Sequence, residues 1–82
     1  MHVELLYFAA VRELVGAAAE HRELPHDVTT IGALSAFLER AHPALAGRLR
    51  SVRFARNERF VDDGEPIADA DVIALIPPVA GG

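Results

Sequence analysis

The residues with the greatest chemical potential lie in the last seven positions, which read Ile-Pro-Pro-Val-Ala-Gly-Gly. Pro77 and Pro78 have no backbone N–H to donate, so they end a strand ladder and keep the chain extended. Gly81 and Gly82 have no side chain, so a terminal carboxylate there can enter a narrow channel at little steric cost. We therefore expect residues 77–82 to form an arm that reaches roughly 20 Å beyond the preceding element.

A carboxylate on such an arm needs activation, because a free carboxylate is a poor electrophile. Transfer to adenylate gives an acyl group with a good leaving group, and a sulfur nucleophile can then leave a thiocarboxylate. An amine can accept the acyl group instead, as in protein tagging. Gly64 stands alone and not in a phosphate-cradling loop. We expect no cofactor to be bound by this chain, and an activating partner to supply the nucleotide site.

The other polar residues form no recognisable catalytic or metal-binding set. The sequence has no cysteine, which excludes disulfides, thiol catalysis and thiolate metal sites. No two histidines are spaced i, i+4, the two serines lie in no nucleophile elbow, and the loop carboxylates lack the spacing of a calcium loop. We expect no metal site and no independent enzyme. The residues considered are His2, His21, His26, His42, Ser35, Ser51, Asp62, Asp63, Asp69 and Asp71.

Composition indicates one small globular domain. The 82 residues are 51% hydrophobic and 24% charged, with a net charge of −4. All eight basic residues are arginine, and the cluster between Arg48 and Arg59 adjoins an acidic stretch, so we expect no nucleic-acid binding. No apolar run approaches the roughly 18 residues of a membrane helix, and the N-terminus makes a poor signal peptide. A cytoplasmic protein with no membrane partner is expected.

The hydrophobic pattern predicts strands and one main helix. Alternation predicts strands over 2–8, 20–25, 51–55 and 59–61, and the apolar run 72–76 predicts a strand that is either covered on both sides or central to the sheet. A short helix over 9–16 ends at Gly16, and a longer one begins at an N-cap, Thr29 or Thr30, and ends before Pro43. Residues 44–50 are predicted to form a further turn, and Asn57 a turn between strands.

These elements predict an α+β fold in which the main helix packs on one face of a mixed sheet of four to five strands. The first two strands form a hairpin, and a right-handed crossover places the last strand beside the first and parallel to it. That arrangement is a β-grasp, or ubiquitin-like roll. We assign residues 1–76 to this domain and 77–82 to the extended tail.

Several segments of the sequence resemble the MoaD family of molybdopterin synthase sulfur-carrier subunits. They are LLYFAAVRELVG near the start, FARNERFVDDGEPIADADVIALIPPVAGG at the end, and the helix between them. The resemblance covers essentially the whole chain, and its most specific part is ALIPPVAGG. One departure is Ala70, where the family usually has glycine between two aspartates. Because glycine favours a turn with positive φ, we expect a slightly different turn here.

The resemblance implies a β-grasp fold and a recycled sulfur donor. An ATP-using adenylyltransferase of the ubiquitin-activating type (MoeB-like) would adenylate Gly82, which would then become a thiocarboxylate. The tail, Pro77, Pro78, Val79, Ala80 and Gly81, would enter the active site of the large catalytic subunit of molybdopterin synthase (MoaE-like). Sulfur would pass there to cyclic pyranopterin monophosphate, with the catalytic side chains supplied by the large subunit.

A carrier that visits two partners needs a reversible docking surface, and the sheet face away from the helix is the expected place. Exposed apolar side chains on that face would anchor the partner, and Arg12 and the acidic stretch 58–71 would add charge complementarity. The alternative is that several of these side chains pack under a loop. The predicted contacts are Leu6, Phe8, Arg12, Phe60, Val72, Ala74 and Ile76.

Three other functions remain open at this point. A related sulfur carrier, of the ThiS type or serving cysteine synthesis or tRNA thiolation, would share the Gly-Gly end and the fold. A protein modifier would conjugate the same end to target lysines. A ubiquitin-like interaction domain would use the body alone and leave the tail inert.

Overall fold

The structure is a computed structural model that describes residues 1–78 of the chain. In order they form β1 (His2–Tyr7), α1 (Ala9–Val15), β2 (Ala19–Glu23), α2 (Ile31–Ala41), two 3₁₀ turns η1 (Pro43–Leu45) and η2 (Leu49–Ser51), β3 (Arg53–Arg56), β4 (Arg59–Val61) and β5 (Val72–Ile76). Val79, Ala80, Gly81 and Gly82, four residues of the predicted tail, lie outside the described residues.

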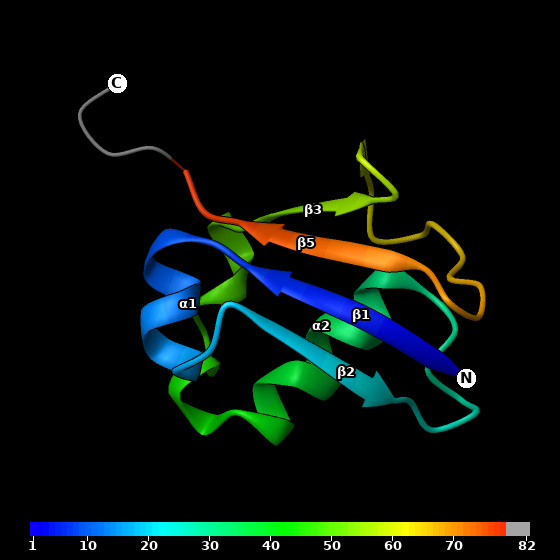
Figure 1. The fold of residues 1–82 in the computed structure, drawn as a ribbon, viewed down its shortest axis with the longest axis horizontal. Coiled ribbons are helices and arrows are strands. Elements are labelled where there is room, and N and C mark those ends of the chain that lie inside the picture. Colours follow the sequence, from blue (N-terminus) through cyan, green and yellow to red (C-terminus); the bar gives the residue numbers. More distant parts are fainter. Residues whose placement is uncertain (79–82) are drawn as a thin grey trace.

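The five strands form one mixed sheet in the order β2-β1-β5-β3-β4, and α2 lies across one face of it (Figure 1). β5 is parallel to β1 and antiparallel to β3, while β1 and β2 form an antiparallel pair. The predicted central position of the last strand and its parallel pairing with the first are therefore confirmed. This is the β-grasp arrangement expected from the sequence.

Local signals position the two helices as predicted. The Thr30 hydroxyl accepts a hydrogen bond from the Ala33 amide at 3.2 Å and begins α2, and Gly16 ends α1 with a φ of 87°. Ile31, Leu34 and Leu38 of α2 are buried against the sheet. The third strand begins two residues later than predicted, because residues 49–51 form the turn η2.

The core lies between α2 and the near face of the sheet. Its strand residues follow the period of two, with Val3, Leu5 and Tyr7 from β1 and Ile73 and Leu75 from β5. The residues between them face the other way and are partly exposed. One face of the sheet is therefore packed, while the opposite face has no element covering it in the described part of the chain (Figure 1).

The expectation for the turn at Ala70 is wrong. Ala70 has a φ of 70°, the left-handed conformation that glycine would favour. Hydrogen bonds hold it there: the Ala70 amide donates to the His2 carbonyl at 2.7 Å, and the His2 amide donates to Asp69 Oδ1 at 2.7 Å. These bonds outweigh the steric cost of a Cβ at positive φ, so the turn persists without glycine.

Candidate functional site

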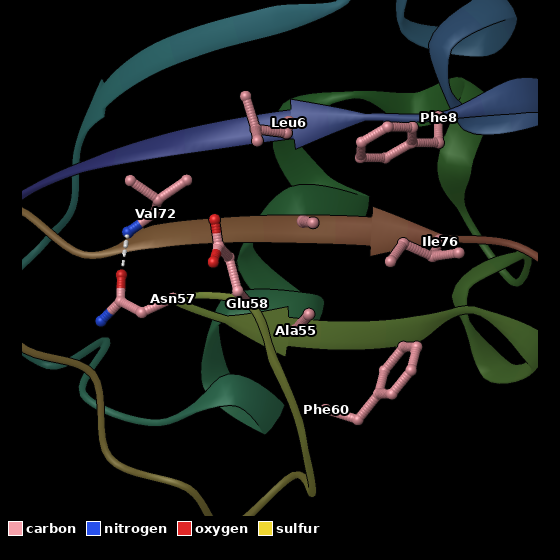
Figure 2. Close-up of a pocket in the computed structure, with 9 residues that line it drawn as sticks. Leu6, Phe8, Ala55, Asn57, Glu58, Phe60, Val72 and Ile76 are labelled. Carbon is pink, nitrogen blue, oxygen red and sulfur yellow. Dashed lines mark hydrogen bonds between the residues drawn. The ribbon is translucent and has the colours of Figure 1, made fainter.

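The uncovered face of the sheet carries an apolar hollow with a volume of about 640 Å³ (Figure 2). We call the residues that line this hollow the docking surface. Six of the predicted contacts line the hollow: Leu6 on β1, Phe8 directly after β1, Phe60 on β4, and three residues on β5. Two further lining residues, Ala55 and Asn57, were not predicted, and Glu58 belongs to the acidic stretch 58–71 that was predicted to add charge complementarity. The docking surface consists of Leu6, Phe8, Ala55, Asn57, Glu58, Phe60, Val72, Ala74 and Ile76.

Strand register explains the shape of the docking surface. Leu6, Ala74, Ala55 and Phe60 are cross-strand partners in one row over β1, β5, β3 and β4. Two alanines in the middle of the row are flanked by two large side chains, so the surface is hollowed at its centre. Ala55 could have been placed by its alternation with Phe54, but only if the pairing of β3 with β5 were known.

Two aromatic side chains at the docking surface are unusually exposed for their size. Phe8 is 46% exposed and Phe60 is 54% exposed. The Arg53 guanidinium lies 4.0 Å from the centre of the Phe60 ring in a cation–π contact. Large apolar groups left exposed together on one face are typical of protein–protein interaction sites.

Arg12 does not join the other predicted contacts. It lies exposed on α1 and does not line the docking surface. The proposal that it meets a partner therefore depends on a partner large enough to cover both the sheet face and α1.

The root of the tail lies beside α1 and the two 3₁₀ turns. Pro77 and Pro78 line a hollow together with Ala10 and Leu14 from α1 and with Arg48, which precedes η2. At the end of β1, the Phe8 amide donates to the Leu75 carbonyl at 3.3 Å and so ties the start of α1 to β5. The docking surface, which includes Ile76, is therefore continuous along the chain with the start of the predicted tail.

A buried carboxylate fixes the opposite end of β5. Asp71 is 5% exposed and accepts hydrogen bonds from the Arg56 guanidinium, from Asn57 Nδ2 at 2.9 Å and from the Ala68 amide at 2.8 Å. Burial by itself raises the pKa of Asp71, but these donors outweigh burial and hold that pKa below its ordinary value. Arg56 also donates to Glu65 at 3.0 Å, so the β3–β4 turn and the loop before β5 are joined.

A second polar cluster links β1, β2 and the end of α2. Glu20 accepts a hydrogen bond from the Tyr7 hydroxyl at 2.6 Å and from Arg22 at 2.8 Å, and His42 Nε2 lies 3.1 Å from it. Burial and the neighbouring carboxylate raise the pKa of Tyr7 above its ordinary value. Burial opposes ionisation of Glu20, but hydrogen bonds from Tyr7, Arg22 and His42 leave its pKa below the ordinary value.

Both clusters are internally satisfied, and this favours a structural role for them. Every buried side-chain polar atom in residues 1–78 has a hydrogen-bond partner. Over the same range, no three His, Cys, Asp or Glu side chains are placed to hold a metal ion. No helix within that range has the length and apolar character needed to cross a membrane. The docking surface and the tail root are thus the features that point outward.

Comparison with known proteins agrees with this geometry. The ThiS family matches residues 5–82.

The chain belongs to the ThiS family.

Among curated relatives, the molybdopterin synthase sulfur carrier subunit of Chlamydomonas reinhardtii is 37% identical over all of both chains. The human protein of the same name is 34% identical over 98% of this chain and 93% of its own. Small archaeal modifier protein 3 of Haloferax volcanii is 37% identical over all of both chains. Relatives with this degree of likeness thus carry names from two functional classes.

Solved structures confirm the β-grasp fold for this ThiS-family chain. The crystal structure of SAMP1 from Haloferax volcanii aligns with a TM-score of 0.86 and 30% identity, covering all of both chains. A chain from the complex of subunits 1 and 2 of the molybdopterin-converting factor of Helicobacter pylori aligns with a TM-score of 0.71 and 28% identity, again over all of both chains.

Proposed function

We propose that this chain is a sulfur carrier that serves as the small subunit of a molybdopterin synthase. The full-length likeness to relatives with that name carries the proposal. The open apolar docking surface supports it, because a carrier needs a surface on which its partners can dock.

The chemistry of the proposal takes place at the main-chain end. The Gly82 carboxylate attacks the α-phosphate of ATP in an adenylyltransferase of the ubiquitin-activating type, releasing pyrophosphate. A sulfur nucleophile then displaces AMP and leaves a thiocarboxylate. ATP belongs to that partner's site, and this chain binds no cofactor. Gly81, Ala80 and Val79 follow the prolines as the thin part of the arm that enters each partner.

In the large catalytic subunit, the thiocarboxylate donates its sulfur to cyclic pyranopterin monophosphate, and water returns Gly82 to a carboxylate. The folded body docks through the apolar side chains of the docking surface, chiefly Phe8 and Ile76. Because β5 ends at Ile76, docking there places the tail root at the edge of the contact. The small subunit is therefore consumed and recycled, while catalytic side chains belong to the partner.

Reconstitution tests this function. The thiocarboxylated chain is incubated with the large synthase subunit and cyclic pyranopterin monophosphate, and the dithiolene product is measured. We expect product to form and the chain to return to its carboxylate form. The matched controls lack Gly82 or carry one extra residue after it, and both should lose transfer while unfolding at the wild-type temperature.

Two results would contradict the proposal. Unchanged transfer by the extended chain would favour an interaction domain with an inert tail. No dithiolene from a fully thiocarboxylated chain would favour another sulfur carrier, serving thiamine-thiazole synthesis, cysteine synthesis or tRNA thiolation.

The likeness to Small archaeal modifier protein 3 favours one alternative, a protein modifier joined to lysines by its C-terminal glycine. Immunoblots of the source cells distinguish the two functions. Higher-mass conjugates that disappear when Gly82 is deleted would support the modifier, whereas a single band at the mass of the free chain supports the carrier.

A further inference from the structure

Among the described residues, one charged side chain of the docking surface takes part in no hydrogen bond or ion pair. Glu58 occupies the two-residue turn between β3 and β4, and its side chain reaches toward β5 beside Val72 (Figure 2). In residues 1–78, no hydrogen bond or ion pair involves the Glu58 carboxylate, although the neighbouring Arg56 forms both with Asp71 and Glu65. The Glu58 carboxylate is therefore available to pair with a group outside residues 1–78.

The backbone at Glu58 is unfavourable for a glutamate. Asn57 has a φ of 50° and Glu58 a φ of 73°, so both central residues of the turn are left-handed. A two-residue hairpin of this kind prefers asparagine followed by glycine, because a Cβ is strained at positive φ. Asn57 fits that preference and Glu58 does not. Folding therefore gains nothing from Glu58 that glycine would not supply better.

The turn nevertheless holds Glu58 in a fixed place. The Asn57 amide donates to the Val72 carbonyl at 2.8 Å, and the Val72 amide donates to Asn57 Oδ1 at 2.9 Å. Asn57 Nδ2 also donates to the buried Asp71 at 2.9 Å. Two of these bonds join Asn57 to the first residue of β5 and the third joins it to Asp71 just before that strand, so the backbone of Glu58 needs little ordering when a partner binds.

We propose that Glu58 is a specificity-determining residue of the docking surface, and that the large synthase subunit presents an arginine or lysine opposite it. This inference rests on the proposed function, which supplies the partner. A carboxylate beside Val72 and Ala74 loses water when an apolar surface covers it, so only a partner with a matching cation avoids that cost. A partner with an apolar or acidic residue there is rejected.

A positive charge, Arg53, lies at the opposite end of the docking surface from Glu58. The two charges together favour one orientation of the bound partner. Arg53 pairs with Ile76 across the sheet and lies over Phe60, whereas Glu58 lies beside Val72. The docking surface thus has a negative charge, Glu58, where β5 begins, and Arg53 places a positive charge at its border where β5 ends. A partner of the opposite polarity binds in one orientation, with its anionic side toward the root of the tail.

Four variants test the role of Glu58 by binding to the large subunit, measured as rates and Kd at several salt concentrations. Glu58→Gln keeps the backbone strain and removes the charge. Glu58→Gly removes both, and Glu58→Arg reverses the charge. Asp27→Asn is the matched control, because Asp27 is an exposed turn carboxylate away from the docking surface.

We expect Glu58→Gln to weaken binding about tenfold at low salt, mainly through a faster dissociation rate, because the partner's buried cation is left unpaired, and to flatten the salt dependence. Glu58→Arg should weaken it further, and Asp27→Asn should bind as wild type. Glu58→Gly should raise the urea midpoint of unfolding while weakening binding as Glu58→Gln does. Higher stability together with weaker binding would show that Glu58 acts in recognition. If Glu58 had a structural role, stability and binding would change in the same direction.

Wild-type affinity and salt dependence in Glu58→Gln would overturn this inference alone. If Ile76→Glu also left binding unchanged, or if the wild-type chain did not bind the large subunit at all, the proposed function would fall with it.

Discussion

The two faces of the sheet differ in how they use apolar side chains. On β5, Ile73 and Leu75 point to α2 and are fully buried, while Ala74 and Ile76 point the other way and are partly exposed. The strand has the same apolar character on both sides, yet only one side contributes to the core. The comparison shows that a nearly all-apolar strand need not be covered on both faces by its own chain.

Apolar side chains contribute to the free energy of folding on one face and to the free energy of binding on the other. Apolar area removed from water on the helix side stabilises the fold, at about 25 cal/mol per Å². The same type of surface on the docking side remains in water until a partner covers it, so its contribution appears in binding. Substitutions on the two faces should therefore separate stability from docking.

The largest effect is expected from Ile73→Ala on the covered face. Ile73 is fully buried, so the substitution leaves a cavity beneath α2 and should lower the free energy of unfolding by about 2–5 kcal/mol. Urea unfolding followed by circular dichroism measures this loss. A loss below that range would show that the core at β5 repacks easily and would weaken the contrast between the faces.

Asp71→Asn should lower the free energy of unfolding by about 2 kcal/mol at pH 7, because buried donors from Arg56 and Ala68 lose a charged acceptor. Folding holds the Asp71 pKa below its ordinary value of 3.8, so this stabilisation is complete above that pH. It is lost as pH falls through the folded-state pKa. The difference between variant and wild type should thus shrink in acid, and a difference that stays constant with pH would contradict the assignment.

Ile76→Ala is the counterpart of Ile73→Ala on the open face of the same strand. Because Ile76 is only partly buried, we expect a loss of stability below about 1 kcal/mol. Binding to the large subunit should weaken about tenfold, since an apolar anchor of the docking surface is removed. Calorimetric titration measures the second effect. Equal losses of stability for the two isoleucines would remove the distinction between the faces.

The smallest effect is a gain. Ala70→Gly removes a Cβ from a residue whose φ is 70°, and should raise the free energy of unfolding by about 0.5–1 kcal/mol. Ala70 lies away from the docking surface, so binding should not change. The urea midpoint of this variant also provides the reference for Glu58→Gly. A decrease in stability would show that the alanine methyl contributes a contact there.

Sequence patterns were sufficient for the fold because its main signals are periodic. The alternation around Leu5, the helical spacing of Ile31, Leu34 and Leu38, and the apolar run 72–76 each identify an element and its buried side. The right-handed crossover rule then leaves one simple topology. The face that carries Leu6 and Phe8 follows from the same alternation.

The rest of the site depends on register and on contacts between distant segments. Ala55 and Glu58 reach the docking surface because β3 pairs with β5 in one register, which no local pattern specifies. The Asp71 network requires the loop before β5 to meet the β3–β4 turn, and the Glu20 cluster requires β2 to meet the end of α2. Hydrogen bonds to His2 hold Ala70 at a left-handed φ, so the expectation drawn from replacing glycine by alanine was wrong.

Intact-mass measurement of the chain purified from its source cells tests the central claim most directly. If the body is a docking module for a reactive C-terminal glycine, a fraction of the chain carries one sulfur in place of one oxygen, and fragmentation places that sulfur at Gly82. The fraction should vanish in cells that lack the adenylyltransferase. A chain that carries only oxygen at Gly82, in cells that are actively making molybdopterin, would contradict the account.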